Sequence, residues 1–198
     1  MEFLNQTYIA LRGPTGAPQS ATEAIARLSD RLGPATLLSD RRAAVLSLKG
    51  LVRDCRADVG ERALPGLLEV LQNDAEVDSD TGKAVLETLN LLCEVNEDAS
   101  AQAKELSFKH TDQVLATEAA THKLFALLLD QSFYIRLAVL QYLVTLLQNR
   151  RQVVQAYFLK APVGPTTVIA ALDEKREVIR TGALNGCGYA SWTHVWRR

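Results

Sequence analysis

The chain has 198 residues, 47% of them hydrophobic and 23% charged, and a formal net charge of −1. This length and composition predict one soluble globular domain with its own core. The charge balance argues against a nucleic-acid groove and a polybasic membrane anchor, because both need an excess of lysine and arginine. The three cysteines are far apart and form no CxxC pair, so we expect no disulfide framework and no zinc site, and a reducing cytosol fits.

The N-terminal segment, residues 1–20, is expected to be an irregular lead into the first helix. It has no basic region followed by a long apolar run, so a signal peptide is not expected, and no apolar stretch of the sequence approaches the ~20 residues that span a bilayer. The stretch 12–20 holds two prolines and two glycines, which predicts a loop. The first helix is expected to begin near Ser20 or Thr22 and to end near Leu32, before a Gly-Pro pair.

The next segment, residues 21–184, repeats one helical phrase. Three copies read Ala-Val-Leu and the fourth reads Gly-Ala-Leu, at 44–46, 84–86, 138–140 and 182–184, with intervals of 40, 54 and 44 residues. Each copy lies in a stretch with apolar residues at three- and four-residue spacing, which indicates an amphipathic helix. A second segment of this kind precedes the later copies across polar breaks, at 64–71, 124–129 and 168–172.

A unit of two helices with a period near ~40 residues is typical of armadillo and HEAT solenoids. Neither helix can bury its apolar face alone, so stacked units form one continuous core. We therefore predict an all-α fold, a right-handed α-α superhelix of about four armadillo-like repeats over residues 21–184, with the last repeat incomplete.

Two segments interrupt this pattern. Residues 94–113 are polar and weakly patterned and account for the long second interval, so we expect a partly mobile surface insertion there. Residues 185–198 place two glycines within three positions, which opposes a helix, and they would cap a solenoid poorly. We interpret 185–198 as an atypical tail from a truncated or mispredicted reading frame.

The patterns that could indicate reactive or metal-binding residues are incomplete in this sequence. The acidic stretch 76–87 has the carboxylate spacing of a calcium loop, but Thr81 stands where the sharp turn needs glycine. We interpret it as an acidic turn between helices. The pair Gly82-Lys83 lacks the rest of a P-loop, the three histidines have no ligand at metal spacing, and no serine lies in a nucleophile elbow. We therefore predict no catalytic residue, metal or cofactor, and a binding protein rather than an enzyme.

Polar residues on the helices that carry the repeated phrase are candidates for partner contact, because inner helices line the concave surface of such solenoids. We expect this role for Ser47, Lys49, Glu87, Asn90 and Gln141. Three arginines also recur beside the phrase and are expected to pair with aspartates of the preceding turns: Arg42 with Asp40, Arg136 with Asp130 and Arg180 with Asp173.

Several segments, in order, resemble a known family. Thr36–Leu51, the Val-Gly within Asp58–Asp74 and Arg176–Arg180 resemble the start of the general vesicular transport factor family, the golgin-like vesicle tethers also called transcytosis-associated proteins. The opening Met1–Leu4 and the loop after it also resemble that family's N-terminus, and the resemblance covers roughly residues 1–184.

The resemblance implies that these residues form the N-terminal part of an armadillo-like head, which in the family precedes a long coiled coil and an acidic tail. It implies vesicle tethering in ER-to-Golgi and intra-Golgi transport, in the cytoplasm and peripherally on the Golgi membrane. The implied partners are Rab-family GTPases, SNARE proteins and other golgins, without nucleic acid, and homodimerisation of the full-length protein. Two alternatives stay open: a generic armadillo/HEAT adaptor or scaffold unrelated to Golgi traffic, and the regulatory subunit of an enzyme.

Overall fold

The computed structural model describes residues 20–160 and 176–190, with side chains of the last segment described up to residue 183. Within these ranges every regular element is a helix, which confirms the predicted all-α fold. The helices are α2 (Ala21–Asp30), α3 (Leu38–Asp74), α4 (Ser79–Cys93), α5 (Ala101–Ala116), α6 (Glu118–Leu127), α7 (Phe133–Lys160) and α9 (Glu177–Ala190). The predicted helix at 168–172 lies outside the described residues.

Two of these helices are bent at a single residue. Cys55 in α3 has φ −130° and ψ 39°, and Arg150 in α7 has φ −139° and ψ 57°. Both conformations are non-helical, so each long helix consists of an inner half followed by an outer half. The inner halves are residues 38–54 and 133–149.

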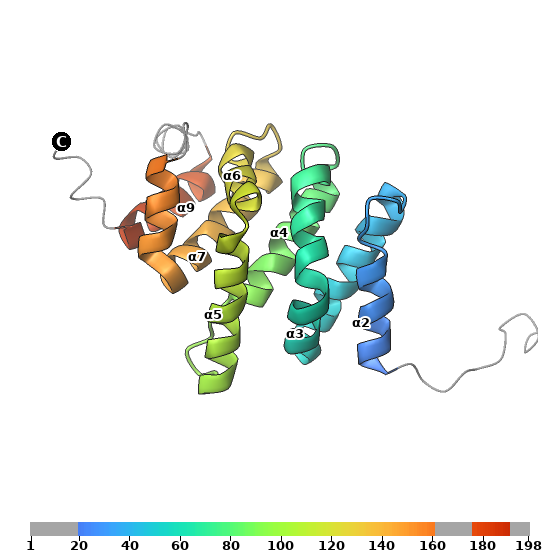
Figure 1. Ribbon diagram of the computed structural model, residues 1–198. Helices are drawn as coiled ribbons and strands as arrows, with labels where there is room; N and C mark the ends of the chain where they lie inside the picture. Colours follow the sequence, from blue (N-terminus) through green and yellow to red (C-terminus); the bar gives the residue numbers. More distant parts are fainter. Residues whose placement is uncertain (1–19, 161–175, 191–198) are drawn as a thin grey trace, which may run out of the picture.

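The helices form two layers (Figure 1). The outer layer holds α2, the outer half of α3, α5 with α6 following it end to end, and the outer half of α7, all at the front of the view, and the inner halves cross behind them. In the inner layer α3 packs on α4, α4 on α7 and α7 on α9. This arrangement is that of an armadillo-like solenoid, whereas the handedness and the number of repeats stay predictions.

The repeated phrase lies at the centre of the core. Its first two residues are buried in the first three copies, as is the alanine of the fourth, namely Ala44, Val45, Ala84, Val85, Ala138, Val139 and Ala183. Gly82 shows how close the inner helices come, since a Cβ atom there would lie 2.9 Å from Ala75 O and 2.9 Å from Ile135 Cδ1. Burial of these side chains between neighbouring units supplies the hydrophobic stabilisation that a single unit lacks.

The first helix begins as predicted. Ser20 caps α2, and its hydroxyl accepts a hydrogen bond from Glu23 N at 3.2 Å, which satisfies one of the free N–H groups of the first turn. The helix ends at Asp30, slightly before the predicted end, and Leu32 is buried beyond it.

The expectation of a mobile surface insertion at 94–113 needs correction, because residues 101–116 form α5. Ser100 caps this helix by accepting from Ala103 N at 3.2 Å. Its buried face carries Ser107, His110 and Thr111. A search for apolar periodicity does not register a helix that buries polar side chains.

The helix break expected after Leu184 is also wrong, because α9 continues through two glycines to Ala190. Each glycine costs a helix about 1 kcal/mol relative to alanine. α9 packs on α7, and tertiary packing supplies most of the stability of helices in proteins. The interpretation of residues 185–198 as a mispredicted tail stays a prediction, and residues 191–198 lie outside the described part of the chain.

Candidate functional site

The residues expected to contact a partner lie on the inner layer, and several of them contact each other. Lys49 Nζ on α3 lies 2.5 Å from Glu87 Oε2 on α4. Lys83 Nζ lies 3.9 Å from the other oxygen of the same carboxylate. All three side chains are partly exposed, so the pairs add little to stability. The Lys49–Glu87 pair links α3 to α4 at the surface, whereas the Lys83–Glu87 pair lies within α4.

The other three expected residues differ in their exposure. Asn90 on α4 accepts a hydrogen bond at 2.7 Å from the hydroxyl of Thr145 on α7. Gln141 is exposed one turn before Thr145, and Ser47 is exposed with its hydroxyl donating to Ala43 O at 2.9 Å. Lys49, Glu87 and Asn90 therefore join neighbouring helices, while Ser47 and Gln141 present side chains to solvent. Partner contact by these five residues stays a prediction.

The carboxylates between α3 and α4 form ion pairs with basic side chains of neighbouring helices. Arg42 Nη1 lies 3.4 Å from Asp78 and 3.4 Å from Asp80. Lys123 Nζ from α6 lies 2.9 Å from Glu76. Within residues 20–160 and 176–190 no group of three or more His, Cys, Asp or Glu side chains is placed to hold a metal ion.

The expected pairing of Arg42 with Asp40 is therefore wrong. The arginine reaches forward to the N-terminus of α4, because the following unit packs against it, and not back to its own turn. Arg136 does contact its preceding turn, but it donates to the main-chain oxygen of Asp130 at 2.8 Å. Asp173 lies outside the described residues.

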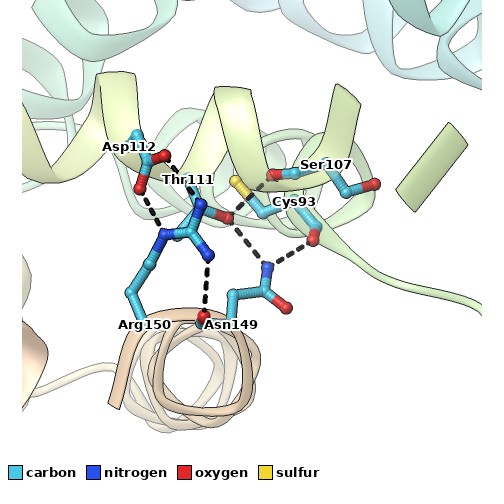
Figure 2. Close-up of polar contacts among 6 residues, drawn as sticks. All are labelled: Cys93, Ser107, Thr111, Asp112, Asn149 and Arg150. Carbon is cyan, nitrogen blue, oxygen red and sulfur yellow. Dashed lines mark hydrogen bonds and ion pairs between the residues drawn. The ribbon is translucent and has the colours of Figure 1, made fainter. Parts of the chain in front are cut away.

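A polar cluster ties the bend of α7 to α5 and α4 (Figure 2). Arg150 Nε and Nη2 donate to the two carboxylate oxygens of Asp112 at 2.6 and 2.8 Å. Asn149 Nδ2 donates to Cys93 O and to the Thr111 hydroxyl, both at 2.8 Å. Hydrogen bonds from Arg150 lower the pKa of Asp112, so this carboxylate is charged at neutral pH.

The bend of α3 is tied to the same two helices. Arg56, directly after the bent residue Cys55, donates to Glu94 O at 3.0 Å and to the Ser107 hydroxyl at 2.9 Å. Ser107 also donates to Glu94 O at 3.0 Å. One helix, α5, thus supplies side chains that hold both bends, which gives its polar residues a structural role.

His110 is one of three buried polar residues on α5. It is 2% exposed, and its Nδ1 lies 3.1 Å from Leu92 O. Its ring lies against Gly60 of α3, where a Cβ atom would be 2.0 Å from His110 Nε2. Burial lowers the pKa of His110, so the ring is neutral and Nδ1–H donates to the carbonyl.

A groove of about 970 Å³ follows the solvent side of α5. Its lining consists of α5 residues and Arg150: Ala101, Gln102, Lys104, Glu105, Leu106, Phe108, Lys109, Asp112, Gln113, Ala116 and Arg150. The guanidinium of Arg150 lies 4.8 Å from the centre of the Phe108 ring, within the range of a cation–π contact. The Arg150–Asp112 pair therefore belongs both to the polar cluster and to the groove.

The groove and the polar cluster were not predicted from the sequence. A usable signal was the repeat period, because several side-chain pairs lie 38 residues apart, among them Arg42–Asp80, Lys49–Glu87 and Arg150–Asp112. Opposite charges one repeat apart can meet where neighbouring units stack. Helical periodicity within one unit does not indicate which side chains of neighbouring units meet.

The fold and these inter-unit contacts define an armadillo-like helical-repeat protein. No protein-family model matches the sequence. The general vesicular transport factor p115 of Homo sapiens and of Bos taurus is 32% identical over 178 residues, which cover 87% of this chain and 18% of the relative. The intracellular protein transport protein USO1 of Saccharomyces cerevisiae is 29% identical over 194 residues, covering 84% of this chain and 11% of the relative.

Solved structures of transport proteins also match the chain. The crystal structure of Uso1-2 matches with a TM-score of 0.80 and 26% identity, and the match covers 91% of this chain and 31% of that one. The chain is therefore a homologue of the general vesicular transport factors, which confirms the resemblance seen in its sequence. It spans less than a fifth of the length of the p115 relatives. Among the described residues, no helix is long and apolar enough to cross a membrane.

Proposed function

We propose that this chain is the N-terminal head segment of a vesicle-tethering protein, acting in ER-to-Golgi and intra-Golgi transport by binding other proteins. The observation that supports this most is the joint match in sequence and fold: 32% identity to p115 over 87% of the chain and a TM-score of 0.80 to Uso1-2. The names of the similar proteins describe transport factors, which favours binding over catalysis.

The proposed partners are Rab-family GTPases, SNARE proteins and other golgins. Through them the protein would associate peripherally with the cytoplasmic side of the Golgi membrane, and the full-length protein would form a homodimer. The inner layer is the proposed contact surface. Ser47 on α3 and Gln141 on α7 are the two of the five expected contact residues whose side chains are exposed.

The test is direct binding of the purified chain to a panel of Rab GTPases, each loaded with GTP analogue or with GDP, and to SNARE cytoplasmic domains. We expect saturable binding to at least one panel member. Ser47→Arg and Gln141→Arg are expected to weaken that binding about tenfold or more, because a long cation replaces a small or neutral side chain at the contact. Gln152→Arg, an exposed position on the outer half of α7, is the matched control.

Two outcomes would contradict the proposal. Absence of binding to the whole panel by a chain that circular dichroism shows to be folded would remove the tethering function. Specific capture of a phosphatase or kinase catalytic subunit instead would favour the regulatory-subunit alternative. If the panel binds but Gln152→Arg weakens binding as much as Ser47→Arg, the function stands and the inner-layer assignment is wrong.

A further inference from the structure

We infer that residues 101–111, the first part of α5, form a latch that detaches from α3, α4 and α7 when His110 binds a proton, while the inner layer stays folded. The latch belongs to the outer layer (Figure 1). The inference rests on how this segment is attached to its neighbours and does not depend on the vesicle-tethering function.

Polar side chains attach the latch to the rest of the molecule. The residues that it buries are Ser107, His110 and Thr111. Its large apolar side chains, Leu106 and Phe108, are partly exposed. The next helix, α6, differs because it buries several apolar side chains in the core. A segment with few buried apolar contacts opens at a lower free energy than the core of the protein.

The hydroxyl groups of the latch bond to the neighbouring helices. Ser107 accepts a hydrogen bond from Arg56 of α3 at 2.9 Å and donates one to Glu94 O at 3.0 Å. Thr111 accepts from Asn149 of α7 at 2.8 Å, and Figure 2 shows this contact. Water can replace each of these bonds after detachment, so their net contribution to attachment is small.

His110 is the titratable side chain that the latch buries. Its Nδ1–H donates to Leu92 O of α4 at 3.1 Å. Its Nε2 lies where a side chain at Gly60 of α3 would be, and among the described residues no group forms a hydrogen bond with Nε2. A proton on Nε2 would therefore add a buried charge and a buried N–H donor that both lack a partner.

The charges around the ring also oppose protonation. Burial lowers the pKa of His110, the hydrogen bond to Leu92 raises it, and the charges of Arg56 and Lys109 lower it further. No carboxylate is among these groups in the described part of the chain. On the side of α7 the latch meets the neutral amide of Asn149.

The direction of the pH effect follows from these contacts. A detached ring lies in water and has the ordinary pKa of about 6.5, whereas the attached ring has a lower pKa. The detached state therefore binds the proton more tightly, so attachment is fully favoured above about pH 6.5 and weakens as the pH falls below it. A helical segment this short loses its structure in water once its packing is lost.

Detachment would also uncover the thiol of Cys93 on α4. This thiol is fully buried, and the hydroxyls of Tyr142 and Thr111 contact it. Burial raises the pKa of Cys93 to about 11, so the attached latch covers a protonated thiol. Because Thr111 leaves with the latch, the reactivity of Cys93 reports detachment independently of backbone measurements.

The first test is amide hydrogen exchange of the whole 198-residue chain at pH 7.5 and pH 5.5. Each rate is divided into that of the unfolded chain at the same pH, which gives a protection factor. We expect protection of residues 105–111 to fall about tenfold over this interval, because opening takes up one proton. At both pH values it should be lower than in α4 and insensitive to 1 M urea, since a local opening exposes little surface.

Two results of this measurement would overturn the inference. Protection of residues 105–111 that does not change with pH would show that His110 does not control the segment. Protection and urea dependence equal to those of α4 would show that the segment opens only when the whole chain unfolds.

Substitution of the histidine tests its role. His110→Gln keeps a donor for the Leu92 carbonyl but does not titrate, so protection of residues 105–111 should lose its pH dependence. His122→Gln, at an exposed histidine of α6, is the matched control and should keep the tenfold fall. A full pH effect in His110→Gln would overturn the inference.

A charge reversal gives a second test that leaves the buried ring in place. Lys109→Glu, at an exposed position, puts a carboxylate beside His110 and raises its attached-state pKa, so the fall in protection should be smaller. Arg151→Glu, exposed on the outer half of α7, carries the same charge change and should leave the fall unchanged. Equal effects of the two substitutions would show a response to net charge alone and overturn the inference.

Thiol reactivity provides the independent readout. Cys55→Ser combined with Cys187→Ser leaves Cys93 as the sole cysteine, and 4,4′-dithiodipyridine is a probe that reacts with thiols in mild acid. We expect the rate for the folded chain, divided by that for the unfolded chain at the same pH, to rise about tenfold from pH 7.5 to pH 5.5. A constant ratio, or an equal rise when His110→Gln is added, would contradict detachment of the latch.

Discussion

At the scale of single residues, the contact between Gly60 and His110 is the tightest of the glycine contacts in the described part of the chain. The His110 ring occupies the space that a side chain at Gly60 would need. A helical glycine normally weakens a helix. Here the lost helix propensity is offset by the close approach of α5 to α3, which buries a polar ring with its hydrogen bond made.

Gly60→Ala is expected to destabilise the protein by about 1–3 kcal/mol, because the new methyl group overlaps the imidazole ring and forces it to move. Gly50→Ala is the matched control, since nothing lies within 4 Å of a Cβ atom there. The control is expected to stabilise the protein by about 0.5–1 kcal/mol. Urea unfolding of the three proteins measures both effects, and equal changes of the same sign would contradict the steric explanation.

His110 should also make stability depend on pH. Burial lowers its folded-state pKa below the ordinary value of about 6.5, so the unfolded chain binds the proton more tightly than the folded one. The stabilisation is complete above the unfolded pKa and is lost as pH falls towards the folded one. The charges of Arg56 and Lys109 also lower this pKa, while the hydrogen bond to the carbonyl of Leu92 raises it.

We therefore expect the free energy of unfolding to fall between about pH 7 and pH 5. His110→Gln keeps a donor for the Leu92 carbonyl but does not titrate, so its stability should be flatter over this interval. His122→Gln, at an exposed histidine of α6, is the control and should keep the full slope. Parallel profiles for all three proteins would assign the pH dependence to other groups.

At the scale of elements, α5 holds the bends of its two neighbours. Asn149, Arg150 and Arg56 each connect a bent helix to it. A helix interrupted at one residue loses backbone hydrogen bonds there. The side chains of Arg56, Asn149 and Arg150 bond to side chains of α5 and to carbonyls at the end of α4, so the direction of each outer half is fixed from outside.

Asp112→Asn should loosen the outer half of α7. It replaces a charged bidentate pair by weaker contacts, and the expected loss of stability is at most about 1 kcal/mol because both partners are partly exposed. The clearer readout is amide hydrogen exchange, expected to quicken in residues 151–160 more than in α4. Glu118→Gln, which removes the 3.8 Å contact with His122, is the control and should leave residues 151–160 unchanged.

At the scale of the whole molecule, stability depends on stacking of the inner helices. Gly82 lies where α4 passes closest to the start of α7, against Ala75 O and Ile135 Cδ1. The carbonyl belongs to the backbone and cannot move like the end of a flexible side chain. Any side chain at Gly82 therefore separates the units before and after it.

Gly82→Ala is expected to lower the free energy of unfolding by about 1–3 kcal/mol. Because units of a solenoid are coupled through their interfaces, we also expect a broader urea transition than in the wild-type chain. Gly182→Ala is a useful comparison, since its Cβ atom would meet Leu140 only at an ordinary 3.4 Å. A sharp wild-type-like transition in Gly82→Ala would contradict strong coupling across this interface.

The amino-acid sequence by itself determined the helical class, the repeated phrase, the start of α2 and the family. These features depend on the local spacing of apolar side chains and on capping residues, which a single segment carries. The same reasoning placed Lys49, Glu87 and Asn90 on inner helices, although it did not foresee that they contact neighbouring units.

Only the tertiary structure decided the role of residues 94–116, the partner of Arg42, the bends at Cys55 and Arg150, and the groove along α5. The polar contacts among these features depend on groups from different units meeting within hydrogen-bond distance, often 38 residues apart in the chain. Local periodicity specifies which face of a helix is buried. Which group on the neighbouring unit it meets is set by how closely the units stack, and glycines such as Gly60 and Gly82 fix that spacing.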